Sequence, residues 1–142
     1  MTKIHQYTIM CVSITSQMAA CEALATGKSS VEAMKREYNR RREFVVGELN
    51  RIGLACEKPQ GAFYAFPSIQ STGMSSLDFA RGLLEERKVA VIPGVAFGSA
   101  YDDRVRLSYA SSFEKLREAL KRIETYAAGI SGQRRPRSRR SR

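Results

Sequence analysis

The chain has 142 residues, of which 43% are apolar, a composition that suits one compact domain with appendages and excludes a fully disordered protein. Its formal net charge is +10, but six arginines lie within residues 134–142, and removing these six from +10 leaves +4 for the rest. The strong basic character therefore belongs to the C-terminal end and not to the fold. No apolar run approaches the ~20 residues of a membrane-spanning helix, so we expect no membrane association.

Two helices are predicted at the N-terminal end of the chain. Apolar residues recur at helical spacing over residues 12–26, and Gly27 is expected to end this helix. Ser29 and Glu32 match a capping box and predict the start of a second helix, long and amphipathic, which Gly53 ends.

Short strands and two more helices are predicted after Gly53. The strand candidates, of which the last alternates most clearly, are residues 54–57, 62–66, 89–92 and 104–109. One helix follows the polar loop 68–75, and the final helix runs from a capping box at Ser111 and Glu114 to Gly129. The order predicts an α+β fold, with two N-terminal helices leading into a small sheet of short strands that has helices packed on one face.

Three cysteines and one histidine limit the chemistry. Cys11, Cys21 and Cys56 cannot all pair, and their spacing matches no zinc pattern, so we expect reduced thiols, no metal site and a cytoplasmic location. A Ser/His or Cys/His nucleophile would have to use His5, close to a chain end, and we predict no catalytic residue of that kind.

Arg106 is the residue whose position suggests a binding role. It lies between Val105 and Leu107 in the last predicted strand, on the face opposite the apolar side chains. A guanidinium held by a rigid strand can grip a carboxylate through two parallel hydrogen bonds. Spacing alone favours a solvent-facing arginine on an edge strand, so at this point both interpretations stay open.

Three segments follow one another in a distinctive order: GAFYAFP over residues 61–67, VIPGVAFG over 91–98 and VRLSYA over 105–110. Together they resemble the C-terminal part of the class I/II aminotransferases, the fold-type-I group that depends on pyridoxal phosphate. Prokaryotic aspartate-type enzymes are the most similar members. The resemblance covers the chain from Met1 to about Tyr126 and leaves out the basic end.

The resemblance implies a function and a role for Arg106. The family's intact enzymes transfer an amino group between an amino acid and a 2-oxo acid, and the arginine of the matching strand holds the substrate's α-carboxylate. The resemblance also implies that residues 1–28 are an N-terminal segment with an interface helix from a large domain and that 29–130 are the small domain. The composition of residues 131–142, which is Ser, Gly, Gln, Pro and Arg, predicts a disordered basic tail.

The cofactor lysine of the family is not among these residues. In the family a Ser-x-Ser-Lys-type motif supplies the Schiff base to pyridoxal phosphate, and that motif is absent here. We therefore predict no catalytic and no cofactor-binding residue, no pyridoxal phosphate on this chain alone, and no activity alone. An exposed apolar patch of Ile14, Met18 and Leu24 favours a partner, either an upstream large-domain fragment or a second copy in a homo-oligomer.

Two alternative functions remain compatible with the sequence. The arginine-rich tail could bind nucleic acid or another polyanion weakly and without sequence specificity. The chain could also be a non-catalytic interaction domain that has kept the fold and lost the chemistry.

Overall fold

The computed structural model describes residues 1–133 and divides the chain into two compact units, Met1–Glu37 and Tyr38–Arg142. The six arginines of the predicted polyanion-binding tail lie outside the described residues. Among the described helices, none combines the length and the apolar content that crossing a membrane requires.

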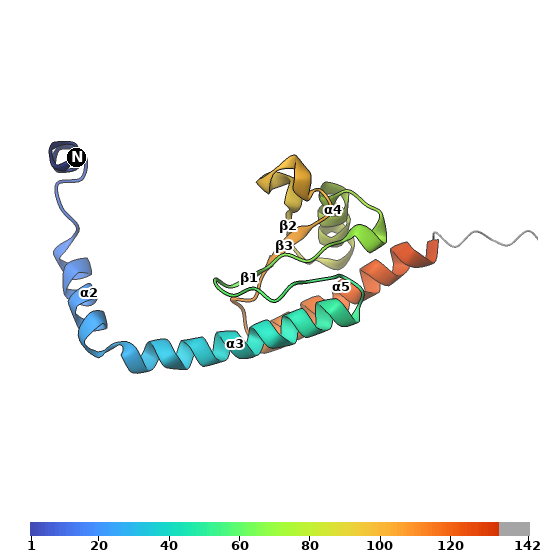
Figure 1. Ribbon diagram of the computed structural model, residues 1–142, viewed down its shortest axis with the longest axis horizontal. Coiled ribbons are helices and arrows are strands. Elements are labelled where there is room, and N and C mark those ends of the chain that lie inside the picture. The colour runs from blue at the N-terminus through green and yellow to red at the C-terminus, as the bar shows by residue number, and fades with distance from the viewer. Residues whose placement is uncertain (134–142) are drawn as a thin grey trace, which may run out of the picture. The chain divides into compact units, whose positions relative to one another are not determined.

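The first unit contains α1 (Thr2–Thr8), α2 (Ile14–Thr26) and the beginning of α3 (Lys28–Arg51), as Figure 1 shows. Helix α1 was not expected from the sequence. No residue of this unit is buried, and Ile14, Met18 and Leu24 of α2 are 69%, 68% and 89% exposed. The three side chains that were expected to form an apolar patch are therefore all exposed.

The joint between α2 and α3 differs from the prediction. Gly27 keeps a right-handed helical conformation, its N–H donates to the carbonyl oxygen of Ala23 at 2.9 Å, and α3 already begins at Lys28. Ser29 therefore lies inside the helix, and the predicted capping box is wrong. A Cβ at Gly27 would fall 2.4 Å from the Ala23 oxygen, so the close approach requires glycine.

Three short strands form an antiparallel sheet in the order β1-β3-β2. Strand β1 (Tyr64–Ala65) pairs Ala65 with Leu107 of β3 (Val105–Ser108), and β2 (Ile92–Pro93) pairs with the other side of β3. Strand β3 is thus central, and the interpretation of Arg106 as an arginine on an edge strand is wrong.

The predicted strand at residues 54–57 does not form. The side chain of Asn50 donates to the carbonyl oxygen of Cys56 at 2.9 Å and accepts from the Cys56 N–H at 3.0 Å. These are the two backbone groups that a neighbouring strand would use. Leu54 and Cys56 are nevertheless buried, which is why their spacing imitated a strand.

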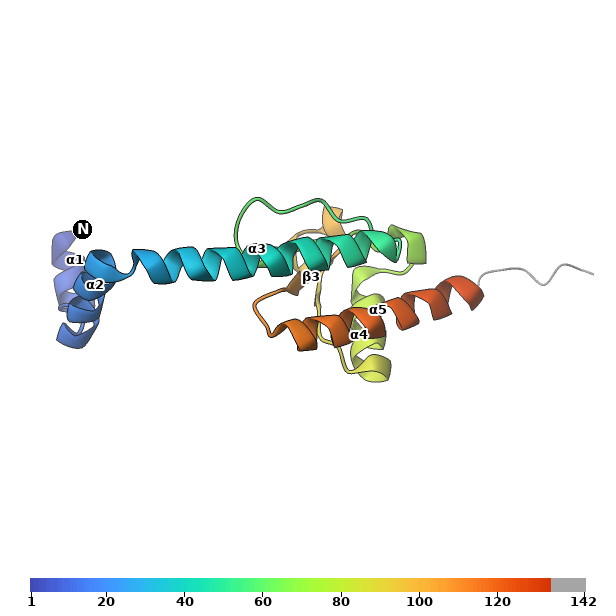
Figure 2. The same ribbon diagram turned by 90° about the horizontal axis from the view of Figure 1, so that it is seen from below.

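One face of the sheet packs with helices into a single core. Helices α3 and α5 (Phe113–Gln133) lie side by side in both views (Figures 1 and 2), and α4 (Ser76–Arg87) packs on α5. The fully buried or nearly buried residues of this core include Val45, Leu49, Ala65, Phe79, Leu83, Val105, Leu120 and Ile123, together with Tyr109 just after β3. The predicted α+β fold is confirmed.

The ends of the last two helices follow from hydrogen bonding and packing. The side chain of Ser75 accepts from the N–H of Asp78 at 3.1 Å and caps α4. Helix α5 begins one residue later than predicted, since Ser112 rather than Ser111 accepts from the first turn. It also continues past Gly129 to Gln133, because Ile130 packs against the core.

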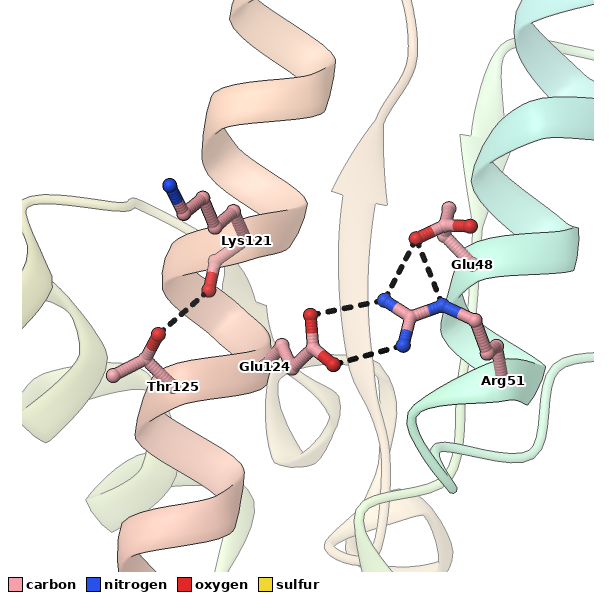
Figure 3. A network of polar contacts seen from close by, with 5 residues as sticks. All are labelled: Glu48, Arg51, Lys121, Glu124 and Thr125. Atoms are coloured by element: carbon pink, nitrogen blue, oxygen red, sulfur yellow. Dashed lines mark hydrogen bonds and ion pairs between the residues drawn. The ribbon is translucent and has the colours of Figure 1, made fainter.

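An ion-pair network joins α3 to α5. Figure 3 shows the guanidinium of Arg51 donating to both carboxylate oxygens of Glu124, at 2.8 and 2.9 Å, and also to Glu48. This hydrogen bonding to Arg51 lowers the pKa of Glu124. The network ties together the two helices that support the sheet.

Candidate functional site

Arg106 lies in the middle of the central strand with its side chain half-buried. The guanidinium carbon is 4.4 Å from the ring centre of Tyr64 and 4.8 Å from that of Phe97. Within residues 1–133 the Arg106 side chain has no hydrogen bond and no ion pair. Its donors are therefore not taken by any group of the described chain.

The three segments that carry the family resemblance meet at this point. Tyr64 comes from residues 61–67, Phe97 from 91–98 and Arg106 from 105–110. We call these three residues the Arg106 site. Sheet order brings them together, because β3 lies between β1 and β2 and the helical turn η2 (Gly94–Phe97) directly follows β2.

A second cluster lies next to the Arg106 site and was missed by the sequence analysis. Arg104 stacks over Phe66 at 5.9 Å, donates to its carbonyl oxygen at 3.3 Å and lies 3.9 Å from the carboxylate of Asp103. Phe66 also contacts the ring of Tyr101 at 5.7 Å. Arg104 is two residues before Arg106, so alternation along the strand could have indicated it.

A buried serine fixes the loop that carries Phe97. The hydroxyl of Ser76, which is fully buried, donates to a carboxylate oxygen of Asp102 at 2.7 Å and accepts from the N–H of Val95 at 3.2 Å. The N–H of Gly94 donates to the carbonyl oxygen of Arg104 at 2.9 Å. The start of α4, the loop and β3 are thus held together by hydrogen bonds.

Tyr109 fixes the loop that precedes Tyr64. Its hydroxyl donates to the carbonyl oxygen of Ala62 at 3.0 Å, and its N–H donates to that of Phe63 at 2.9 Å. Burial of the Tyr109 side chain raises the pKa of its hydroxyl, which moves the loss of this donor to still higher pH. Ala62 has a φ of +58°, a conformation that these contacts maintain.

The chemistry available at the Arg106 site is anion binding. A guanidinium presents a planar fork of donors that matches a carboxylate, and the rings of Tyr64 and Phe97 offer no acceptor of comparable strength to compete. Among residues 1–133 no cluster of His, Cys, Asp and Glu side chains is arranged to hold a metal ion. The site therefore suits a carboxylate better than a cation.

Of the cavities that described residues border, two lie in the second unit. One of about 560 Å³ is bordered by Lys88, Ser108 and Arg122, and one of about 230 Å³ lies beside Cys56 and Arg104. Arg106 lines neither of them. Since Phe97 is 44% exposed, the Arg106 site lies at the surface of this chain.

Comparison with known proteins gives a consistent result. The family model for aminotransferase class I and II matches residues 3–123. The putative aminotransferase YugH of Bacillus subtilis is 53% identical over 89% of this chain and 33% of its own length. The aspartate aminotransferase of Pyrococcus horikoshii is 51% identical over 91% of this chain and 34% of its own length.

Solved structures agree with the sequence matches. The aromatic aminotransferase from Pyrococcus horikoshii OT3 superimposes with a TM-score of 0.85 at 44% identity, covering 89% of this chain and 34% of that one. The chain thus spans about a third of the length of the relatives it matches and corresponds to their C-terminal part. Since the family model matches 121 consecutive positions, residues 3–123, the chain belongs to the class I and II aminotransferases.

Proposed function

We propose that this chain supplies the substrate-carboxylate clamp of an aminotransferase that transfers an amino group between an amino acid and a 2-oxo acid. Arg106 is the residue that binds the α-carboxylate. The observation that carries the proposal is a half-buried guanidinium on the central strand with no hydrogen-bonding or ionic partner within residues 1–133. The names of relatives as aspartate and aromatic aminotransferases support the reaction type.

One clamp can serve both half-reactions. An amino acid and the corresponding 2-oxo acid carry the same carboxylate at the same distance from the reacting carbon. A bidentate, charge-assisted pair fixes the position of that carbon and its orientation. Arg106 thus orients the substrate, and the reacting groups come from outside this chain.

The lysines of this chain do not fit the covalent attachment of pyridoxal phosphate, the cofactor of intact enzymes of this family. A lysine that forms a Schiff base at neutral pH needs a pKa lowered by burial or by neighbouring cations. All seven lysines here are exposed. We therefore propose that the chain alone holds no pyridoxal phosphate and catalyses no transamination. A stoichiometric visible absorption band that survives dialysis against cofactor-free buffer would contradict this.

Complementation tests the role of Arg106. The chain is mixed with the N-terminal two thirds of the Pyrococcus horikoshii aspartate aminotransferase and pyridoxal phosphate, and amino-group transfer is measured. Where activity is restored, we expect Arg106→Gln to raise KM for amino acid and 2-oxo acid together by roughly 30-fold or more, since truncating a charge pair of this kind costs about 2 kcal/mol or more. Arg81→Gln, a change at an exposed arginine on α4, is the matched control. Equal KM values for Arg106→Gln and wild type would refute the assigned role.

The exposed apolar side chains of the first unit support association with a partner. Ile4, Met10, Ile14, Met18 and Leu24 are all more than half exposed, an unusual concentration for a protein that stays monomeric. We propose that this unit is covered by the large domain of the intact enzyme or by a second copy. Light scattering on the purified chain tests it, and a clean monomer up to high concentration would contradict it.

A further inference from the structure

The position of the Arg106 guanidinium depends on ring contacts. An arginine side chain has four rotatable torsions, and a bidentate grip requires its end group in one orientation. Within residues 1–133 no hydrogen bond or ion pair holds that end group. The rings of Tyr64 and Phe97 lie against it, with their centres 4.4 and 4.8 Å from the guanidinium carbon.

We propose that Tyr64 and Phe97 are positioning residues that hold the Arg106 guanidinium ready for a carboxylate, an inference that rests on the proposed function. Ring contacts of this kind stabilise the charged guanidinium through its flat face. They leave the N–H groups at its edge available, because an aromatic ring offers no strong acceptor. The carboxylate then meets a donor fork that is already oriented, so less side-chain entropy is lost on binding.

The two rings are held by independent parts of the fold. Tyr64 lies on β1, paired with Ser108, next to the loop that Tyr109 anchors through its hydrogen bonds to Ala62 and Phe63. Phe97 lies on the loop that Ser76 anchors. Each ring therefore has its own support, and removing one leaves the other in place.

Tyr101 provides a matched comparison for Phe97. The two residues lie on the same loop, are 45% and 44% exposed, and contact Phe66 at 5.7 and 5.8 Å. Within the described part of the chain, Phe97 contacts the Arg106 guanidinium and Tyr101 does not. A difference between variants at these two positions therefore reports on Arg106 and not on the loop in general.

The experiment uses the full chain with isotope-labelled arginine. The Nε–Hε resonance of Arg106, assigned by its loss in Arg106→Lys, is followed by NMR while pyruvate, the smallest 2-oxo acid, is added. Nitrogen relaxation in the absence of pyruvate measures the mobility of the same group. We expect Tyr64→Leu and Phe97→Leu each to raise this mobility and to weaken pyruvate binding by about two- to fivefold. Tyr64→Phe, Phe97→Tyr and Tyr101→Leu should match the wild type.

The outcomes separate the two proposals. If both leucine variants leave mobility and affinity unchanged, or if Tyr101→Leu changes them as much as Phe97→Leu does, the positioning role is overturned while the clamp stands. If pyruvate does not shift the wild-type Arg106 resonance, the proposed function fails. Greater mobility in the two leucine variants would then still support the positioning of the guanidinium by the rings.

Discussion

Replacing Gly94 by alanine should destabilise the second unit, because two backbone carbonyls occupy the space of the new methyl group. A Cβ there would fall 2.0 Å from the carbonyl oxygen of Tyr101 and 2.5 Å from that of Arg104. The shorter distance is more than 1 Å below the 3.4 Å at which ordinary contact begins. Neither oxygen can withdraw easily, since one accepts from the Arg104 N–H at 3.0 Å and the other from the Gly94 N–H at 2.9 Å. Overpacking against backbone that cannot move costs at least about 2 kcal/mol.

Gly47→Ala is the control, because the same methyl group meets nothing within 4 Å in the interior of α3. There the higher helix propensity of alanine should stabilise the protein by about 0.5–1 kcal/mol. Urea denaturation followed by far-ultraviolet circular dichroism measures the free energy of unfolding of both variants. In thermal scans, Gly94→Ala should have a Tm lower than that of the wild type by roughly 8–16 °C. Equal stabilities of Gly94→Ala and the wild type, or a loss of similar size in Gly47→Ala, would refute the steric argument.

Three further predictions concern buried or paired polar groups. Ser76→Ala should cost about 1–3 kcal/mol in urea denaturation, because it leaves the N–H of Val95 without its acceptor and removes the hydroxyl donor from Asp102 Oδ1, which keeps the hydrogen bond from the Ser76 N–H. The pKa of Glu124 is lowered in the folded protein by its pairing with Arg51. This pairing therefore contributes its full stability to the folded state at pH values above the ordinary glutamate pKa, and the contribution is lost as pH falls through the folded-state pKa. The stability gap between wild type and Glu124→Gln, measured by urea denaturation, should therefore be larger at about pH 7 than at about pH 3. In titration with a thiol reagent at neutral pH, two exposed cysteines should react at once, and Cys56 should react only on unfolding, because burial also raises its thiol pKa.

Helical periodicity predicted most of the second unit because each of its helices buries one stripe. The apolar spacing in α3, α4 and α5 corresponds to residues such as Leu49, Leu83 and Leu120 that lie in the core. Apolar spacing also predicted a strand at residues 54–57, and that prediction was wrong, because Leu54 and Cys56 are buried without pairing to another strand. Apolar spacing reports which side chains are buried and does not report which backbone groups pair.

The order of the strands in the sheet could not be predicted from the sequence either, and the candidate site depends on it. Alternation placed Arg106 opposite Val105 and Leu107, and the structure keeps Val105 buried on the core side. Nothing in the spacing predicted that β3 would lie between β1 and β2. Without that order the contacts of Tyr64 and Phe97 with Arg106 cannot be inferred, since Tyr64 precedes the arginine by a loop, a helix and a further strand.

The way β3 is built links the stability of the second unit to the orientation of its guanidinium. Val105 and Tyr109 are almost completely buried, while Arg106 between them turns to the other face. Because the neighbouring side chains are fixed in the core, the backbone at Arg106 cannot rotate, and only the side-chain torsions of Arg106 remain free. Those torsions are the ones that Tyr64 and Phe97 restrict. Core variants should therefore raise the mobility of the Arg106 guanidinium only as far as they unfold the second unit. Variants at Tyr64 and Phe97 should raise that mobility while the unit stays folded. Measuring the free energy of unfolding and the side-chain mobility on the same samples separates the two effects.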